Sequence, residues 1–245
     1  MTTTAWRDLE SMIRSTRFSG DAPVDLPEPV GRYFEAALGS QAQTSPAAIL
    51  TMRGSIKIGR WLRFRARQLL APRLGTVWEA TVAGVIRGSD RYVDGTGAMD
   101  WKLFGVVPIV RADGVDVSRS SAERAAGESI WVPSAVSPAA GTKWRATGPG
   151  SITAIIDTGG HPVSIEHLID ESGRLSSSSF PRWGDPDRTG TWAEHPFGVE
   201  VAEHRQFGSI QVPSRGEVGW YHGTDRWRDG VFFRFELEDY TLLSP

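Results

Sequence analysis

Arg124 and Glu128 lie four residues apart, just before Trp131 and Pro133, and this group could support acid–base chemistry. On a helix, side chains with this spacing form an ion pair. If the pair faces an apolar cavity, burial could shift the pKa of the Glu128 carboxyl and suit it to proton transfer. The alternative is a structural ion pair that orients the turn from Trp131 to Pro133, and it is the favoured interpretation.

Two further residues are candidates for proton transfer. Asp90 precedes a strongly amphipathic segment, and His195 follows Glu194 in an expected loop. An imidazole titrates near neutral pH, and loops on a rigid sheet commonly carry function. Exposed loop histidines are nevertheless common. The candidate catalytic residues are therefore Glu128, Asp90 and His195.

Candidate ligand contacts come from the large and polar side chains expected on apolar strand faces. Gln68 falls on the apolar side of a strand whose other side carries Arg63, Arg65 and Arg67. Such an arginine row could grip a carboxylate or a phosphate, but more often it forms a solvated strand face. The ten tryptophans could line a cavity, although core filling is the favoured interpretation. The candidate ligand-binding residues are Gln68, Trp78, Trp101, Arg124, Trp131 and Arg182.

Several kinds of chemistry lack their usual motifs. The five histidines include no helical metal-binding pair, and the absence of cysteine excludes thiolate nucleophiles and disulfides. No G-x-S-x-G segment marks a serine nucleophile. The glycine clusters at 95–97 and 158–160 fall in expected hairpin turns, whereas a dinucleotide site needs a strand–helix turn. We expect no metal and no cofactor.

Charge and hydropathy bound the partners. The net charge of −2 gives no electrostatic argument for nucleic acid or an anionic membrane. No stretch approaches the roughly 18 apolar residues of a membrane span. Residues 1–20 contain no apolar run long enough for a signal peptide. We expect a soluble, cytoplasmic protein with no nucleic-acid partner and no stable membrane insertion, and the sequence does not indicate its oligomeric state.

The expected elements begin with two helices. Trp6, Leu9 and Ile13 recur at helical spacing after a possible N-cap at Thr4. A Pro-rich break precedes a second helix over residues 28–38. A third helix is expected from about 116 to 131.

From residue 49 the apolar period changes to two, which is typical of strands. We expect a loop at 181–186, and Glu194–Pro196 in another. The expected strands and hairpins cover 61–69, 76–82, 90–99, 143 onward, 152–157, 163–169, 174–180, 199–207, 209–212, 217–221 and 231–240.

This pattern predicts a fold with about ten strands and three helices. Short turns join most neighbouring strands, so antiparallel pairing is expected. We predict one α+β domain over residues 1–245, with a helical segment at 1–40 and a β-rich body at 49–245. The large antiparallel sheet would be curved, half-barrel or barrel-like, and covered by a few helices.

Eight short segments, taken together, resemble a bacterial family of uncharacterised domains. They are Leu26–Phe34, Met52–Gly54, Phe64-x-Ala-x-Gln68, Val77–Trp78, Asp90-Arg-Tyr-x-Asp-Gly-x-Gly97, Arg124-x-x-x-Glu128-x-x-Trp131-x-Pro133, Asp170-x-x-Gly-Arg174 and Phe207-Gly-x-Ile-x-Val-Pro213. The resemblance implies that these residues form the family's framework, and it implies no activity. The architecture is also similar to lipid-carrier half-barrels, in which helices close a curved sheet around an apolar cavity.

Three functional hypotheses follow. The first is binding of an apolar or amphipathic small molecule in the concavity of the sheet. The alternative is a cofactor-independent cyclase, isomerase or hydrolase that acts on such a molecule in the same cavity. The third is a structural or partner-binding protein with a filled core. The sequence does not indicate the ligand, the pathway or whether the protein is an enzyme.

Overall fold

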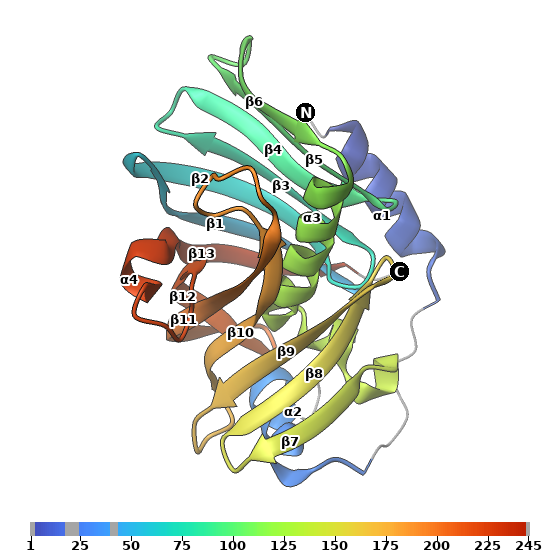
Figure 1. Cartoon of the computed structure of the whole chain (residues 1–245). Coiled ribbons are helices and arrows are strands. Elements are labelled where there is room, and N and C mark those ends of the chain that lie inside the picture. The colour runs from blue at the N-terminus through green and yellow to red at the C-terminus, as the bar shows by residue number, and fades with distance from the viewer. Residues whose placement is uncertain (1–2, 18–24, 40–43, 244–245) are drawn as a thin grey trace.

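The computed structural model describes residues 3–17, 25–39 and 44–243, and its strands form one large curved sheet (Figure 1). The strands are β1 (Ala47–Ile58), β2 (Arg60–Ala71), β3 (Gly75–Val82), β4 (Ile86–Val93), β5 (Thr96–Leu103), β6 (Val107–Asp113), β7 (Lys143–Gly148), β8 (Ser151–Thr158), β9 (His161–Ile169), β10 (Leu175–Gly184), β11 (Ala193–Phe207), β12 (Ile210–Trp220) and β13 (Val231–Leu243).

Four α-helices accompany the described part of the sheet. They are α1 (Thr4–Ser15), α2 (Glu28–Leu38), α3 (Val115–Gly127) and the short α4 (Trp227–Gly230). Three 3-10 turns, at Glu128–Trp131, Pro133–Val136 and Pro138–Ala140, follow α3 and lead to β7. Parts of the predicted 1–40 segment, at 1–2, 18–24 and 40, lie outside the described residues.

The sheet consists of two meanders that meet in the middle. The strand order runs from β6 down to β1, continues with β13, and ends at β7. All pairings are antiparallel, and β1 and β13 join the halves with Ala47 opposite Leu243. The order gives β6 and β7 one sheet neighbour each among the described strands, so the sheet does not close. The predicted α+β fold with a large, curved antiparallel sheet is confirmed.

Helix α3 crosses the concave side of the sheet, whereas α1 covers part of the convex side (Figure 1). Strand β2 shows how the sequence divides the two sides. Phe64, Ala66 and Gln68 are buried towards the concave side, while Arg63 and Arg65 are exposed, as the alternation predicts.

Helix α1 packs on the convex side through a small apolar cluster. Trp6 and Leu9 of α1 pack against Leu69 and Val77. The Arg67 guanidinium lies 4.3 Å from the centre of the Trp6 ring, and it covers this edge of the apolar cluster. The arginine row therefore does not line the concave cavity.

Two segments predicted as loops lie wholly or mostly in strands. Residues 181–184 belong to β10, and Glu194–Pro196 belongs to β11. Pro181 and Pro196 lie opposite each other. Two residues without an N–H can share a ladder only at a non-hydrogen-bonded position, and β9 no longer pairs with β10 beyond Ser179. The prolines are therefore compatible with strand structure here.

Other boundaries also differ from the predictions. The segments 209–212 and 217–221 form one strand, β12, and the described chain has more strands than expected. Helix α3 ends at Gly127, and a 3-10 turn continues to Trp131. Thr3 caps α1 in place of Thr4, since its Oγ1 accepts a hydrogen bond from the Trp6 N–H.

Candidate functional site

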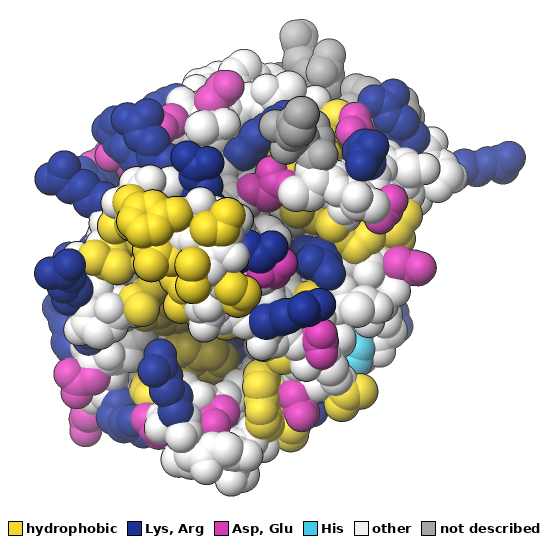
Figure 2. All heavy atoms as spheres, turned by 90° about the horizontal axis from the view of Figure 1, so that it is seen from above, with side chains coloured by type: hydrophobic (Ala, Val, Ile, Leu, Met, Phe, Trp, Pro, Cys, Tyr) yellow, Lys and Arg dark blue, Asp and Glu magenta, His cyan; other side chains and the backbone are white. Residues whose placement is uncertain are grey.

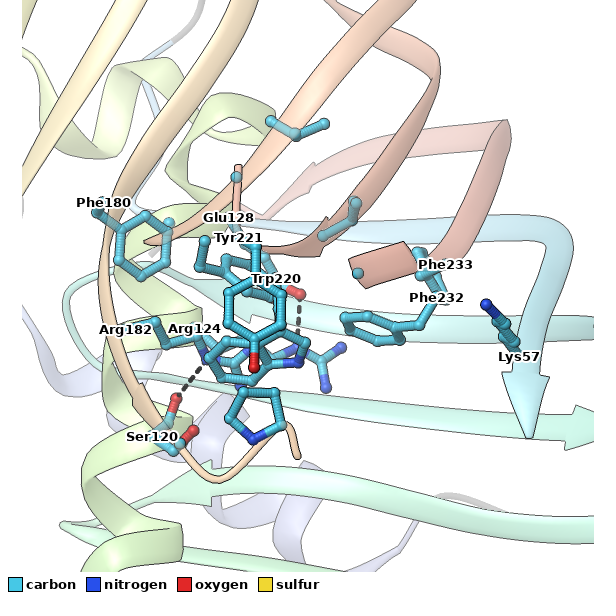
Figure 3. Close-up of a pocket in the computed structure, with 18 of the residues that line it drawn as sticks. Lys57, Ser120, Arg124, Glu128, Phe180, Arg182, Trp220, Tyr221, Phe232 and Phe233 are labelled. Atoms are coloured by element: carbon cyan, nitrogen blue, oxygen red, sulfur yellow. Dashed lines mark hydrogen bonds and ion pairs between the residues drawn. The ribbon is translucent and has the colours of Figure 1, made fainter. Parts of the chain in front are cut away.

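A cavity of about 620 Å³ lies on the concave side, between α3 and strands from both meanders (Figure 3). Much of its lining is aromatic, with contributions from Trp78, Trp131, Phe180, Trp220 and Phe233. Charged side chains from α3, β4 and β10 also reach it. The cavity therefore combines apolar surface with a small number of polar groups, as ligand sites commonly do.

A hydrogen-bonded group centred on Arg124 forms the polar part of the wall, and we call it the Arg124 cluster. Arg124 donates from Nε to Glu128 Oε1 at 2.7 Å and from Nη1 to Asp90 Oδ2 at 3.1 Å. Trp101 Nε1 donates to Asp90 Oδ1 at 2.8 Å, and Gln68 Nε2 donates to Glu128 Oε2 at 2.6 Å. Each of the four carboxylate oxygens thus accepts a hydrogen bond.

Sheet register brings the members of this cluster together. Gln68 lies opposite Trp78, and Trp78 lies opposite Asp90 on the next strand. Gly88 leaves room for Trp101, because a Cβ there would lie 2.5 Å from the indole Cδ2. Helix α3 then places Arg124 over this row of side chains, with its guanidinium 5.5 Å from the centre of the Trp78 ring.

Opposing effects act on the ionisation of Arg124. Burial by itself would lower the pKa of the guanidinium, but the nearby carboxylates of Glu128 and Asp90 outweigh burial and raise it. Arg124 is therefore a permanent cation, and its charge is balanced locally by two acceptors that are themselves hydrogen-bonded.

Arg182 is a second cation in the cavity wall, half-buried and with fewer partners. Its Nε donates to the Ser120 carbonyl at 3.3 Å, and its guanidinium lies 4.5 Å from the centre of the Phe197 ring and 5.2 Å from that of Trp220. No described residue accepts a hydrogen bond from its Nη atoms. Burial, followed by the charge of Arg124, lowers the pKa of Arg182 to about 10. It remains charged at neutral pH.

Two further polar atoms of the cavity lining lack partners among the described residues. They are the Ser178 hydroxyl and the Trp78 indole N–H, and both side chains are almost fully buried. Buried polar groups are normally hydrogen-bonded. The cavity therefore offers unused hydrogen-bonding capacity at several points of its wall.

An ion pair stands at the outer part of the cavity. Arg226 contacts Asp187 at 2.6 Å, and Tyr221 donates to the same carboxylate at 2.7 Å. The hydrogen bonds from Arg226 and Tyr221 hold the pKa of Asp187 below its usual range. These contacts fix the 185–192 loop, several of whose residues line the cavity.

The structure brings together most of the side chains named from the sequence. Six of the nine candidates line the cavity, namely Asp90, Glu128, Trp78, Arg124, Trp131 and Arg182. Gln68 and Trp101 lie behind the wall and contact it through hydrogen bonds. His195 is opposite Arg182 on the neighbouring strand, but it packs edge-on against Trp220 and Tyr221 and is not part of the lining.

Sequence reasoning missed several lining residues. Phe180 and Ser178 share a strand face with Arg182, and period-two spacing could have identified them once the strand was extended to Gly184. Trp220 and Phe233 come from the distant C-terminal strands, and local spacing gives no signal for their position. Gly127 has a packing role, because a Cβ there would meet the Phe180 ring at 2.4 Å.

Two structural features are not found among the described residues. No group of three or more His, Asp or Glu side chains is placed to hold a metal ion. None of the described helices combines the length and apolar character needed to cross a membrane.

Several solved structures have a similar fold at low identity. A LolA-superfamily protein from Nitrosomonas europaea has a TM-score of 0.43 and 10% identity, covering 91% of this chain and 96% of its own. A DUF1329-family protein from Desulfovibrio piger has a TM-score of 0.46 and 10% identity, covering 88% and 90%. A putative outer-membrane lipoprotein-sorting protein domain from Vibrio parahaemolyticus has a TM-score of 0.38 and 8% identity, covering 80% and 85%.

Sequence comparison gives a family without an assigned activity. No curated protein matches the chain significantly. The model of one protein family, described as a family of unknown function, matches residues 16–235 and therefore most of the chain. The protein belongs to this family of unknown function, DUF6544.

Proposed function

We propose that the protein binds an amphipathic small molecule in the concave cavity. The apolar part of the ligand packs among the aromatic side chains, and an oxygen at its polar end accepts hydrogen bonds from Arg182. The observation that carries this proposal is the Arg182 guanidinium, which lines the cavity without an acceptor for its Nη atoms among the described residues.

The energetic argument concerns a charged donor that faces the cavity without a protein acceptor. A hydrogen bond to a charged group contributes more to stability than one between neutral groups. A ligand oxygen would form such a bond with Arg182 in surroundings that are less polar than water. The ring faces of Phe197 and Trp220 fix the guanidinium, so little side-chain entropy is lost on binding.

The charges of the lining constrain the polar end of the ligand. The basic and acidic side chains that line the cavity are five each, namely Lys57, Arg124, Arg182, Arg188 and Arg226 against Asp90, Glu128, Asp185, Asp187 and Asp229. This balance gives no net preference for an anion over a neutral group. The proposed polar end is therefore defined by its oxygen acceptor, and an ester, an amide or a carboxylate paired with Arg182 each supply one.

The size of the cavity fits a small molecule. Ligand pockets typically have volumes of roughly 300–1,000 Å³ and are mostly apolar with a few oriented polar groups. The cavity here, at about 620 Å³, lies within that range. Its aromatic walls suit an apolar body, because aromatic side chains offer large contact areas with few rotatable bonds.

The test is native mass spectrometry of the purified protein before and after organic extraction, followed by binding of the extracted compound or, if none is retained, of the fluorescent fatty acid cis-parinaric acid. We expect Arg182→Met to bind roughly ten-fold more weakly than the wild type, because a charged hydrogen bond is lost. Arg145→Met is the matched control, since Arg145 lies exposed on β7 away from the cavity lining.

Two outcomes would contradict the proposal. A wild-type protein that retains no compound and binds no probe would show that the cavity is not a ligand site. Equal affinities of the wild type and Arg182→Met would leave a ligand site but remove the assigned role of Arg182. Circular dichroism of each variant shows whether its fold is retained.

An enzyme acting in the same cavity is the second candidate, and one observation favours it. Asp90 and Glu128 both line the cavity and are within reach of a bound molecule. Their four oxygens already accept hydrogen bonds, which supports a positioning role for both. Incubation of the bound compound with wild type and with Glu128→Gln decides this. Turnover that Glu128→Gln abolishes favours the enzyme, and no turnover by the wild type excludes it for that compound.

A further inference from the structure

One end of the N-terminal meander exposes a set of large apolar side chains. Three hairpin turns lie there on neighbouring strands, and we call their residues 57–63, 83–87 and 102–111 the tip face. Phe104 is 68% exposed and Val106 is 73% exposed. The other exposed large apolar residues of the tip face are Ile58, Trp61, Val107, Ile109 and Val110. Such a concentration exceeds the scattered apolar residues normal on a protein surface.

The charges of the tip face have one sign. Its three segments contain six basic residues and no acidic residue, namely Lys57, Arg60, Arg63, Arg87, Lys102 and Arg111. The chain as a whole carries a net charge of −2, so the tip face differs from the average surface. Lys102 lies 3.4 Å from the Asp100 carboxylate, which offsets its charge. The basic character of the tip face therefore depends on the other five basic residues.

Turn chemistry gives no reason for the most exposed aromatic residue. Phe104 and Gly105 have φ values of 53° and 76°, as in a two-residue turn with both residues left-handed. Gly, Asn and Asp adopt this conformation most readily, and a bulky residue there is unusual. The Phe104 ring therefore adds backbone strain and exposed apolar surface, and neither stabilises the fold.

The β1–β2 turn connects this surface with the cavity. Figure 2 shows a gathered group of hydrophobic side chains with Lys and Arg side chains at its edges, next to a hollow with hydrophobic side chains at its floor. Ile56 and Lys57 line the cavity and lead directly into the β1–β2 turn. A surface in contact with the tip face would thus lie beside one side of the cavity.

We propose that the tip face docks onto an anionic lipid bilayer. Exposed aliphatic and aromatic side chains flanked by Lys and Arg are the combination that binds the interface of an anionic membrane, where apolar groups enter the headgroup region and the cations meet lipid phosphates. The protein is then a peripheral membrane protein, held at the surface without a membrane-spanning segment.

The observations favour a lipid bilayer over other anionic partners. Pro108 lies in the edge strand β6, and a proline without an N–H disfavours addition of a partner strand along that edge. Single-stranded nucleic acid binds through rows of aromatic side chains on which bases stack, whereas most apolar residues of the tip face are aliphatic. A membrane interface uses aliphatic residues of this kind.

The test is co-sedimentation with vesicles of phosphatidylcholine alone and of phosphatidylcholine mixed with phosphatidylglycerol. We expect the wild type to bind the anionic vesicles, and added salt to weaken binding because it screens the cations. Phe104→Asn retains a residue suited to the turn and removes the ring. We expect it to bind roughly ten-fold more weakly, which is the effect of losing a buried aromatic side chain.

Charge variants test the electrostatic part separately. Arg60→Ser and Arg87→Ser should each weaken binding to anionic vesicles roughly five-fold, the usual contribution of one basic residue near such a surface. Arg145→Ser on β7 is the matched control for charge. Val115→Asn is the matched control for apolar exposure, because Val115 is exposed but lies beyond the tip face. Neither control should change binding.

Three results would overturn the proposal. The first is a wild type that does not bind anionic vesicles at low salt. The second is a Phe104→Asn variant that binds them as tightly as the wild type. The third is a tip face that binds a soluble polyanion such as heparin as tightly as it binds the vesicles. This inference does not rest on the proposed ligand. Retention of the cavity compound by Phe104→Asn, measured by native mass spectrometry, keeps failure of docking distinguishable from failure of ligand binding.

Discussion

Helix α3 carries two arginine–carboxylate clusters that are built alike and lie in different surroundings. In the first, Arg119 pairs with Glu123 one helical turn later and with Glu194 from β11, and its guanidinium lies 4.1 Å from the centre of the Trp183 ring. The corresponding partners of Arg124 in the second are Glu128, Asp90 and Trp78. The two clusters therefore use the same residue types in the same arrangement.

The clusters differ in how far solvent reaches their partners. In the first cluster the Glu194 side chain is 54% exposed and Arg119 is 33% exposed, although Glu123 is only 6% exposed, whereas in the second Arg124, Asp90 and Glu128 are 21%, 19% and 15% exposed. Water can replace the lost partner of Glu194, but it cannot easily replace that of Asp90 or Glu128. The comparison teaches that location, more than residue type, makes the Arg124 cluster part of a site.

The largest predicted effect comes from breaking the second cluster. Arg124→Leu leaves the carboxylates of Asp90 and Glu128 partly buried without their common cation, and removal of one partner from a buried ion pair costs roughly 3–5 kcal/mol. We expect the free energy of unfolding in urea to fall by about that amount. A loss no larger than that of Arg119→Leu would show that burial does not distinguish the clusters.

A buried ionisable group without any counter-charge extends the comparison. His167 packs against both Tyr33 and Trp144, neither of its ring nitrogens has a partner among the described residues, and burial lowers its pKa to about 4. The unfolded chain takes up a proton near pH 6.5, and the folded protein does so only near pH 4. The contribution of neutral His167 to the free energy of unfolding is thus fully present above pH 6.5, and it declines as the pH falls towards 4.

The measurement is urea unfolding between pH 8 and pH 4 for wild type and His167→Phe. Between pH 8 and pH 4, we expect the free energy of unfolding of the wild type to fall by about 3 kcal/mol more than that of the variant, as the shift in the His167 pKa implies. The phenyl ring keeps a stack with Tyr33 and Trp144 and removes the titration. Parallel pH profiles would mean that His167 is protonated in the folded protein without cost.

The smallest predicted effect belongs to the first cluster. Arg119→Leu should lower the free energy of unfolding by about 1 kcal/mol, because its contact with Glu194 is exposed and the buried Glu123 keeps a hydrogen bond from the Trp183 N–H. The difference from wild type should shrink in high salt, which screens exposed charges. A loss that persists in high salt would indicate that packing of the guanidinium on Trp183 matters more than its charge.

The sequence predicted those parts of the site that depend on local spacing. Arg124 and Glu128 lie one helical turn apart, so their pairing follows from the helix alone. Asp90 and Gln68 are 34 and 60 residues from their partners in the Arg124 cluster. Their contacts depend on where α3 crosses the sheet, and no local pattern specifies that crossing.

The sequence also predicted the large antiparallel sheet, because alternation and short turns are local signals. It failed where prolines occupy strand positions that need no N–H, as at Pro181 and Pro196. It also identified the turn at Asp94-Gly95 but not the equivalent turn at Phe104-Gly105, although the two have nearly the same φ values. Phenylalanine is not a turn signal, so residue type concealed the hairpin.

The pairing of β1 with β13 has a consequence for synthesis on the ribosome. Strand β1 is translated before the other strands of the sheet, and residues 231–243, which pair with it, are translated after all of them. The first meander can form as it emerges, but one edge of β1 lacks its partner until β13 has left the exit tunnel. Unpaired strand edges invite aggregation, so nascent chains that stall before β13 are the form of this protein most exposed to chaperones and proteases.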